Sequence, residues 1–373
     1  MENFDSLGID TALTEKLAQR NIREPTKIQK LVIPHIFKRE DVLFQSATGT
    51  GKTFAYLLPL LLNLPKELVV IAPTLELCSQ IKREAEFLGQ KACLLIGSAN
   101  ISRQIETLKK EKPSVIVGNG ARLLQLAHMG KLKFSRADAL VLDEGDRLVS
   151  DEQIAETTEL VRLINPQQTI ACSATITGKL RERLLAFTRN AVFLETAEHE
   201  ILRERINHWA LFSENRKKLD CLCSFLAAVH AKKILVFTNN SGQIGNIVAR
   251  LQYHGVSADG LFSGVKKGSR KQAFDDFRRG RLTVLVSSDL AARGLDIPDV
   301  THVISIDAPF ESEDYIHRAG RTARAGKKGV MVTIGNEEEL QRLSRIEKKL
   351  GVIVYPKVLY GGRIVAADTS GVS

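Results

Sequence analysis

The sequence of 373 residues contains no Cys-x-x-Cys pair, and its five cysteines are an odd number. This argues against a disulfide framework and against a cysteine zinc cluster, and it favours a reducing compartment such as the cytoplasm. The first residues are acidic and have no hydrophobic stretch, so we expect no signal peptide. The densest apolar run, residues 54–62, is too short to cross a bilayer. We therefore expect a soluble protein with no membrane partner.

Low-complexity tracts, short-period repeats and a long basic or Gly/Arg-rich tail are also missing. The chain has 44% hydrophobic and 26% charged residues, a globular balance that excludes a disordered chain. Its formal net charge of +10 permits an anionic partner without identifying one. At roughly 150 residues per domain the length predicts two domains or slightly more. We expect a monomer whose targeting comes from partner proteins.

Short apolar runs rich in β-branched residues recur between helix-patterned segments. They lie at 68–72, 92–97, 114–117, 139–142 and 169–172, and again at 233–237, 283–287, 302–306 and 329–334. Runs that are apolar on both faces suit buried parallel strands, and their alternation with helices implies right-handed βαβ units. We predict an α/β fold with two parallel-sheet domains, residues 1–199 and 200–373, joined by a short polar linker. Residues 336–350 predict an amphipathic helix capped by Asn336 and Glu339.

A glycine-containing loop follows the apolar residues 42–44 and precedes a helical pattern. It reads Ser46-Ala47-Thr48-Gly49-Thr50-Gly51-Lys52-Thr53. The two glycines let successive N–H groups point at phosphate oxygens, and the helix adds its positive dipole end. Lys52 would neutralise the β- and γ-phosphates, and the Thr53 hydroxyl would ligate Mg²⁺. Since Ser46 replaces the usual first glycine, the alternative is an ordinary glycine-rich turn opening a helix.

Two adjacent carboxylates, Asp143 and Glu144, end the apolar run 139–142. Alternation at a strand end aims neighbouring side chains in different directions. Asp143 can then hold Mg²⁺ while Glu144 orients and deprotonates the attacking water. A phosphate loop alone also fits kinases, GTPases and transporters, but the sequence has no guanine-reading Asn-Lys-x-Asp. The alternative for the acidic pair is a polar cap on the strand.

Further motifs follow in a specific order. They are Glu24-Pro25-Thr26-Lys27-Ile28-Gln29, Asp143-Glu144-Gly145-Asp146, Ser173-Ala174-Thr175, Ser288-Asp289-Leu290-Ala291-Ala292-Arg293-Gly294-Leu295-Asp296 and His317-Arg318-Ala319-Gly320-Arg321-Thr322-Ala323-Arg324. In this order and spacing the set resembles the DEAD-box family of ATP-dependent RNA helicases, within helicase superfamily 2. The resemblance covers about residues 4–329 and implies two RecA-like domains with ATP and Mg²⁺ between them.

The resemblance implies roles in ATP hydrolysis for residues of both halves. Gln29 would read adenine, as a carboxamide offers a donor and an acceptor together, and Asp296 would bind the ribose. The implied nucleotide set is Thr26, Gln29, Thr48, Gly49, Thr50, Gly51, Lys52, Thr53 and Asp296, and the implied metal set is Thr53 and Asp143. The implied catalytic residues are Glu144, Lys52, Arg321 and Arg324. The two arginines would be fingers from the second domain, and their spacing of three would let them share a helical face.

Coupling and RNA contacts are implied in the same way. The hydroxyls of Ser173 and Thr175 would bond Asp146, and His317 would tie the arginine motif to the cleft. The implied RNA contacts are Pro73, Thr74, Gly97, Arg122, Thr238, Arg270, Ser288 and Arg293. Such loops bind the backbone without reading bases, and contacts to the 2′-OH would give the preference for RNA. For many charges in 266–281 the alternative is a solvated helix.

The sequence departs from the family pattern mainly among the RNA contacts of the first half. Leu75, Ser98 and the stretch Asn119-Gly120-Ala121 replace family residues there, and Gly145 replaces the usual Ala of the acidic motif. The ATP-hydrolysis residues are intact. We therefore expect an ATP hydrolase that clamps and locally unwinds short RNA duplexes or remodels RNA–protein complexes. The alternatives are a superfamily 2 DNA helicase and a weakly active RNA-binding scaffold.

Overall fold

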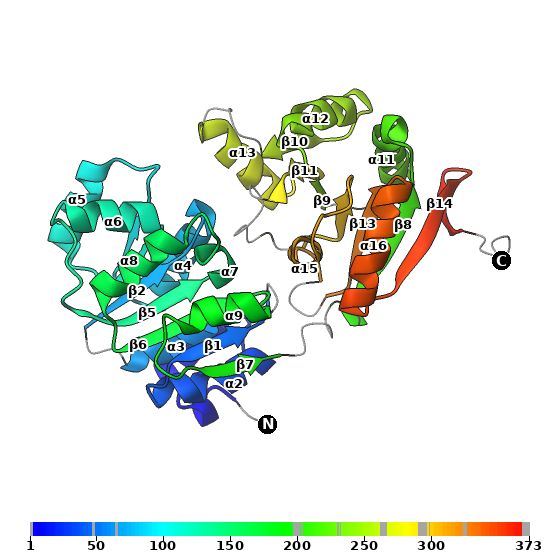
Figure 1. Cartoon of the computed structure of the whole chain (residues 1–373). Coiled ribbons are helices and arrows are strands. Elements are labelled where there is room, and N and C mark those ends of the chain that lie inside the picture. Colours follow the sequence, from blue (N-terminus) through cyan, green and yellow to red (C-terminus); the bar gives the residue numbers. More distant parts are fainter. Residues whose placement is uncertain are drawn as a thin grey trace. The chain divides into compact units, whose positions relative to one another are not determined.

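The computed structural model describes residues 3–46, 49–63, 66–196, 202, 204–229, 231, 233–261, 267–289, 297, 299–323 and 327–367. The chain divides into two compact units, unit 1 (Met1–Ala197) and unit 2 (Glu198–Ser373). Each unit is a mainly parallel β-sheet with helices on both faces (Figure 1). The predicted α/β class is therefore confirmed. Much of the polar stretch predicted as a linker lies outside the described residues.

Unit 1 is built on a parallel sheet with the strand order β3-β4-β2-β5-β6-β1-β7. Its strands are β1 (Val42–Gln45), β2 (Glu67–Ile71), β3 (Ala92–Leu95), β4 (Val115–Gly118), β5 (Ala137–Asp143), β6 (Gln168–Ser173) and β7 (Val192–Glu195). Its helices are η1 (Asp5–Leu7), α1 (Thr11–Gln19), α2 (Lys27–Phe37), α3 (Lys52–Asn63), α4 (Leu75–Phe87), α5 (Ile101–Glu111), α6 (Gly120–His128), α7 (Gly145–Leu148), α8 (Ile154–Ile164) and α9 (Gly178–Leu185).

Alternate strand residues of unit 1 enter two separate cores, one on each face of the sheet. Val42 and Phe44 pack in one cluster, while Leu43 between them packs in the other. This is why the strands read as continuous apolar runs in the sequence. Since the strands are parallel, their carboxyl ends meet at one edge of the sheet, where ligands of open α/β sheets bind.

Unit 2 has the strand order β10-β11-β9-β12-β13-β8-β14-β15. Its strands are β8 (Ile206–Phe212), β9 (Ile234–Phe237), β10 (Ala258–Leu261), β11 (Val284–Ser287), β12 (His302–Ser305), β13 (Gly329–Gly335), β14 (Val354–Tyr360) and β15 (Arg363–Ala366). Its helices are η2 (Asn215–Lys217), α11 (Lys218–Ala228), η3 (Ser241–Gln243), α12 (Ile244–Tyr253), α13 (Lys267–Arg278), α15 (Ser312–Ala319) and α16 (Glu337–Leu350). The last two strands form an antiparallel hairpin.

The helix predicted at residues 336–350 is confirmed as α16, with Asn336 as N-cap and Glu339 completing a capping box. Among the described residues, no helix has the length and apolar character needed to cross a membrane. All five cysteines are free thiols.

Candidate functional site

The predicted site residues of unit 1 gather at the carboxyl edge of its sheet. The strand order places them in two groups along that edge. The residues predicted to bind the ATP phosphates and Mg²⁺ lie at the ends of β1 and β5, and those predicted to couple hydrolysis lie at the end of β6, which pairs with both strands. The residues predicted to contact RNA follow β2, β3 and β4, which are also neighbours. One edge of one sheet thus carries two adjacent groups with different predicted ligands.

Gln29 holds the phosphate loop against α2. Its Oε1 accepts the N–H of Thr26 at 2.9 Å, and its Nε2 donates to the carbonyl of Gly51 at 3.1 Å. Gly51 has φ +91°, and a Cβ there would lie 2.5 Å from Gln29 Nε2, so only glycine fits. The glutamine therefore fixes the loop geometry, while its predicted reading of adenine stays a prediction.

The described part of the loop is closed on itself. Lys52 Nζ donates to the carbonyl of Ser46 at 2.5 Å, and the hydroxyls of Ser46 and Thr50 lie 2.7 Å apart. Gly49 has φ +83°, as expected for a backbone that curls around an anion. Helix α3 begins at Lys52, so its first turn includes Thr53. Thr48 lies outside the described residues.

Asp143 is a buried carboxylate at the end of β5, and its hydrogen-bond partners among the described residues are all neutral groups. Its Oδ2 accepts the Tyr56 hydroxyl at 2.8 Å, and its Oδ1 accepts the Glu144 N–H at 2.9 Å and the Cys172 thiol at 3.2 Å. Burial, and then the charge of Asp143, raise the pKa of both Tyr56 and Cys172 well above their usual values, so both stay protonated donors. Tyr56 is three residues after Thr53 on α3. The two predicted metal ligands are thus linked through one tyrosine.

Glu144 marks a sharp change of direction after Asp143. It has φ +53° and precedes the short helix α7, so the chain leaves the strand conformation at Glu144. That the two carboxylates aim in different directions stays a prediction. A methyl group at Gly145 would lie 2.9 Å from Leu184 Cδ2, so α9 already occupies that space.

The predicted coupling motif is only partly formed. Ser173 Oγ accepts the N–H of Thr175 at 3.3 Å, and the buried Thr175 Oγ1 has no hydrogen-bond partner in the described part of the chain. The predicted hydrogen bond from Thr175 to Asp146 is therefore not made in this structure. The coupling roles of Ser173, Thr175 and Asp146 stay predictions.

Two predicted RNA contacts in unit 1 have structural partners. Thr74 Oγ1 caps α4 by accepting the N–H of Leu77 at 3.2 Å. Arg122 is buried, and its guanidinium donates to the carbonyls of Gly97 at 2.9 Å and Ala99 at 3.1 Å. The arginine therefore orients the loop after β3. Pro73 precedes Thr74 in the loop after β2.

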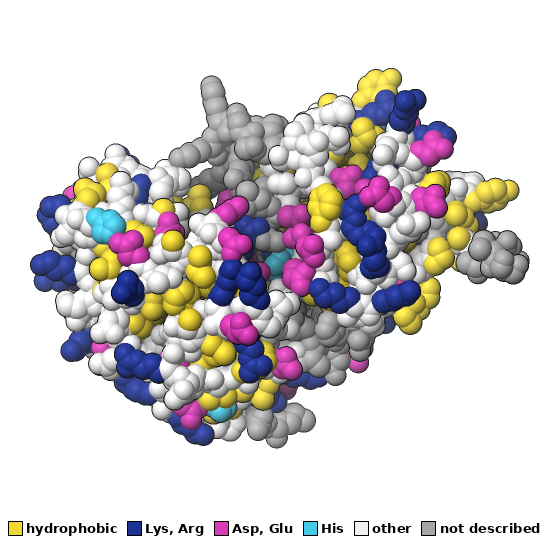
Figure 2. Space-filling model, in the orientation of Figure 1, with side chains coloured by type: hydrophobic (Ala, Val, Ile, Leu, Met, Phe, Trp, Pro, Cys, Tyr) yellow, Lys and Arg dark blue, Asp and Glu magenta, His cyan; other side chains and the backbone are white. Residues whose placement is uncertain are grey.

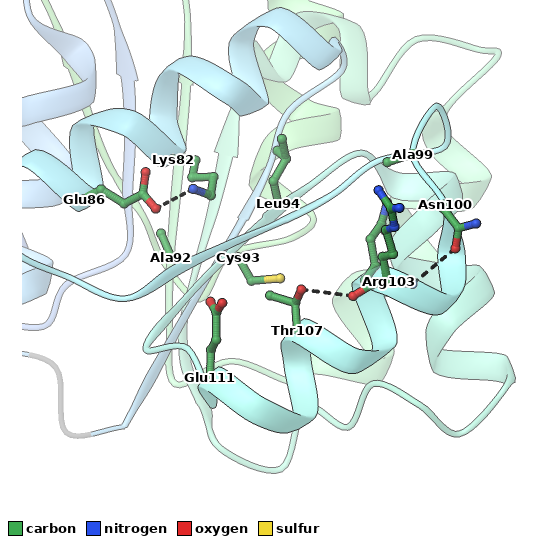
Figure 3. A pocket seen from close by; sticks show the side chains of 11 residues that line it. Lys82, Glu86, Ala92, Cys93, Leu94, Ala99, Asn100, Arg103, Thr107 and Glu111 are labelled. Atoms are coloured by element: carbon green, nitrogen blue, oxygen red, sulfur yellow. Dashed lines mark hydrogen bonds and ion pairs between the residues drawn. The ribbon is translucent and has the colours of Figure 1, made fainter.

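A pocket of about 540 Å³ lies beside the edge strand β3, between α4 and α5 (Figure 3). Its lining includes the ion pair of Lys82 with Glu86 and the side chains of Cys93 and Arg103. Burial raises the pKa of Cys93 to about 11, which keeps the thiol protonated near neutral pH. None of the predicted site residues lines this pocket.

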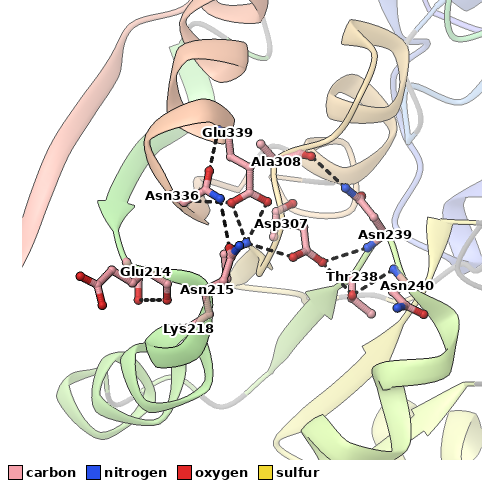
Figure 4. Close-up of polar contacts among 12 residues, drawn as sticks. Glu214, Asn215, Lys218, Thr238, Asn239, Asn240, Asp307, Ala308, Asn336 and Glu339 are labelled. Atoms are coloured by element: carbon pink, nitrogen blue, oxygen red, sulfur yellow. Dashed lines mark hydrogen bonds and ion pairs between the residues drawn. The ribbon is translucent and has the colours of Figure 1, made fainter.

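The strand ends of unit 2 carry a partly buried polar network (Figure 4). Asp307 Oδ1 accepts Lys218 Nζ at 3.1 Å, and its Oδ2 accepts the Thr238 hydroxyl at 2.8 Å and the Asn239 N–H at 3.2 Å. Lys218 Nζ also lies 2.6 Å from a Glu339 carboxylate oxygen. The predicted RNA contact Thr238 is thus fixed by this network. A pocket of about 560 Å³ adjoins it.

Arg321 follows α15, which ends at Ala319 with Gly320 as C-cap. Arg321 and Arg324 were predicted to share a helical face. The helix has ended before Arg321, and Ala323 has φ +55°, outside the helical region, so this prediction is wrong for the described residues 321–323. Arg321 Nε donates to the carbonyl of His317 at 3.2 Å, and both residues are buried.

The structure describes the other predicted site residues of unit 2 only in part. Ser288 follows β11, and its carbonyl accepts the Ser287 hydroxyl at 3.0 Å. Arg270 belongs to α13, but the structure describes only its backbone. Arg293, Asp296 and Arg324 lie outside the described residues.

Known families and proteins match the chain over most of its length. A DEAD/DEAH box helicase model matches residues 26–183, and a Helicase conserved C-terminal domain model matches residues 217–326. The chain is 35% identical to the DEAD-box ATP-dependent RNA helicase CshC of Bacillus cereus, over 95% of this chain and 92% of that protein. The chain belongs to the DEAD-box family of ATP-dependent RNA helicases.

Other DEAD-box proteins are similar in sequence and fold. The helicase CshA of Bacillus cereus is 33% identical over 93% of this chain and 68% of that protein. The solved structure of S. cerevisiae Dbp5 bound to RNA and ADP BeF3 has a TM-score of 0.85 and 25% identity, covering 95% of this chain and 96% of that one. The two units are therefore RecA-like domains of a DEAD-box ATP hydrolase.

Three residues around the site were not found from the sequence. Tyr56 and Cys172 donate to Asp143, and Arg318 is buried with bonds to Asp289, Asn239 and Ser305. The sequence offered a signal for Tyr56, which is a tyrosine inside the apolar run 54–62. A buried hydroxyl needs a hydrogen-bond partner, so a polar group had to lie nearby. Cys172 gave none, since a buried cysteine is common in any core.

Proposed function

We propose that unit 1 binds ATP with Mg²⁺ at the ends of β1, β5 and β6, and that Glu144 is the general base of hydrolysis. The observation that supports this most is the hydrogen bond between Tyr56 and Asp143. It links the helix that follows the phosphate loop to the acidic motif. A phosphate held by the loop would lie close to both carboxylates of that motif.

The residues around Asp143 fit a divalent cation. Mg²⁺ uses one or two carboxylates together with substrate phosphates, and Asp143 is a buried carboxylate whose described partners are neutral. In this proposal Asp143 and the Thr53 hydroxyl hold the ion, which would neutralise charge on the phosphates. Lys52 exchanges its bond to the Ser46 carbonyl for the β- and γ-phosphates. Glu144 orients the attacking water and accepts its proton.

We propose that unit 2 completes the reaction. Arg321 and Arg324 would stabilise charge on the γ-phosphate, Asp296 would bind the ribose, and Gln29 with Thr26 would read the adenine. RNA-backbone contacts from both units would favour the hydrolytic arrangement and locally unwind short duplexes. The five free thiols support a reducing cytoplasm, and we propose that the chain acts there as a monomer.

The test is a Glu144→Gln variant assayed for RNA-stimulated phosphate release. We expect a loss of about 10²–10⁴-fold with unchanged ATP affinity, because only the base is removed. Glu159→Gln, at an exposed position bonded to His128, is the matched control and should keep full activity. Undiminished hydrolysis in Glu144→Gln would show that the base is wrongly assigned. Stimulation by single-stranded DNA, but not by RNA of equal length, would overturn the proposed RNA coupling.

A further inference from the structure

One face of the β14–β15 hairpin in unit 2 is apolar except for Arg363, and no described helix covers it. Val358 pairs with Val365, and Tyr360 lies two residues further along β14 on the same face. The ladder between β8 and β14 runs to Leu211 and Lys357, so the next residues, Phe212 and Val358, are neighbours. The exposed fractions are 63% for Phe212, 44% for Val358, 78% for Tyr360 and 38% for Val365. We call these four residues the hairpin face.

The opposite side of the same hairpin is packed. Leu359 and Ile364 join the core cluster that includes residues of α11. On the side of the hairpin face, α16 packs onto the sheet through Leu343, Ile346 and Leu350. Figure 1 shows β14 continuing beyond α16, and Figure 2 shows hydrophobic side chains along that margin of unit 2. The layer of helices thus stops two strands short of the sheet edge.

The uncovered area has the dimensions of one helix. Two strands about 4.8 Å apart give a strip about 10 Å wide, and packed helices lie about 8–10 Å from their neighbours. The two strands pair over four residues, Lys357–Tyr360 with Arg363–Ala366, a length of about 13 Å, which a helix of about 9 residues spans. An amphipathic helix laid beside α16 would continue the helical layer over the hairpin face.

Arg363, which pairs with Tyr360, is a cation at the turn end of the hairpin face. The charges at the opposite end, beside Phe212, are acidic, although the chain is basic overall. A hollow of about 430 Å³ is lined by Phe212, Glu214, Asn336, Glu337, Glu338 and Gln341. Glu214 contacts Lys217 at 3.3 Å, and Glu338 contacts Arg342 at 3.7 Å. Both carboxylates are exposed, and such surface pairs are weak, so they can exchange for cations of a ligand. The same carboxylates disfavour the phosphates of RNA.

We propose that the hairpin face binds a basic amphipathic α-helix of a partner protein, with its cations toward Glu214, Glu337 and Glu338. Apolar anchors in a groove together with complementary charge are the usual basis of such recognition. Residues 368–373, which follow the hairpin, contain one aliphatic side chain and cannot supply this helix. The proposal does not depend on the assignment of the ATP site.

The test measures fluorescence anisotropy of a labelled 18-residue Leu/Lys amphipathic peptide with the full chain. We expect Val358→Ser to weaken binding at least about tenfold, because it removes the centre of the apolar strip. Tyr253→Ser, at a position 81% exposed on α12, is the matched control and should change affinity less than about twofold. The double variant Glu337→Lys/Glu338→Lys should lose the Leu/Lys peptide and gain affinity for its Leu/Glu counterpart.

Three results would overturn the proposal. The first is equal binding of the peptide to the wild type and Val358→Ser. The second is equal affinity of the wild type for the Leu/Lys and Leu/Glu peptides, which would mean that charge plays no part. The third is a self-association in sedimentation that Val358→Ser abolishes, or a loss of RNA affinity in that variant, without any peptide binding. A second copy or RNA would then be the occupant.

Discussion

Each unit carries an aspartate at the carboxyl ends of its strands, buried in the case of Asp143 and partly buried in the case of Asp307, but the two have opposite surroundings. In unit 2, Asp307 is paired with the ammonium group of Lys218, which also contacts Glu339. In unit 1, Asp143 receives three hydrogen bonds from neutral donors and has no ion pair with any described residue. The protein therefore supplies an ion-paired cation for Asp307, and no described residue forms an ion pair with Asp143.

This difference separates a structural carboxylate from one kept for a ligand. A buried charge without a counterion is unfavourable by several kcal/mol, so it persists only where something offsets it. Tyr56, Cys172 and the Glu144 N–H orient Asp143 without cancelling its charge. A bound divalent cation would cancel it, which is the basis of the metal site proposed above.

The largest expected effect is on turnover when each aspartate is replaced by asparagine. Asp143→Asn should lower RNA-stimulated phosphate release by about 10³-fold, about 4 kcal/mol, with no loss of thermal stability. Asp307→Asn should mainly lower the unfolding free energy, by about 1–2 kcal/mol, because Lys218 keeps only Glu339. Phosphate release and thermal unfolding of both variants measure this. If the two variants lose turnover equally and both stay fully stable, the distinction between a structural Asp307 and a ligand-binding Asp143 is contradicted.

Removing the cation of unit 2 should have the next largest effect. Lys218→Met leaves the partly buried Asp307 and Glu339 without their counterion, and we expect a loss of about 3 kcal/mol in unfolding free energy. Denaturant unfolding measures the loss. Lys217→Met removes the neighbouring exposed lysine and serves as control, with a change below about 0.5 kcal/mol. If both variants are equally stable, the Lys218 network does not support unit 2.

A smaller effect should distinguish the units by pH. Burial raises the pKa of Glu67, at the start of β2, from 4.5 to about 7. Its contribution to unit 1 is complete below pH 4.5 and is lost as the pH rises through 7. Glu67→Gln should therefore stabilise the protein at pH 8 by on the order of 2 kcal/mol, with little effect at pH 4.5.

In unit 2 the pH dependence has the opposite sign. Burial lowers the pKa of His208 below 6.5, so the contribution of His208 to the stability of unit 2 is lost as the pH falls.

Thermal unfolding between pH 4.5 and 8 measures these opposite dependences. We expect the Glu67→Gln variant to lose the decline with rising pH and to keep the decline of unit 2 at low pH. A variant with the same pH profile as the wild type would contradict the role of Glu67.

Structural features that depend on residues close together in the sequence were predictable from the sequence. The buried strands are continuous apolar runs, and the α16 cap is a three-residue spacing, so both were found. The strands β7, β8, β10, β14 and β15 were not. In β14 most side chains are exposed or half-buried on both faces, and in β10 the four residues Ala-Asp-Gly-Leu carry little strand pattern. These strands form because neighbouring strands offer an edge, which no local pattern encodes.

The same was true of the candidate site: residues within local motifs were predictable, and contacts between distant segments were not. Motif order identified Lys52, Asp143 and Glu144, but the partners of Asp143 depend on sheet register. Cys172 reaches it because β5 and β6 pair Asp143 with Cys172. Arg122 looked like an RNA contact in the sequence, and its bonds to the neighbouring loop after β3 appear only once the strand order is known.

The most direct test of the metal site is the effect of Mg²⁺ on the affinity for a non-hydrolysable ATP analogue. The affinity would be measured with and without Mg²⁺ in the wild type, Asp143→Asn and Asp307→Asn. We expect Mg²⁺ to strengthen binding by at least about tenfold in the wild type and in Asp307→Asn, and to have almost no effect in Asp143→Asn. An Asp143→Asn variant that keeps the full Mg²⁺ effect would contradict the account.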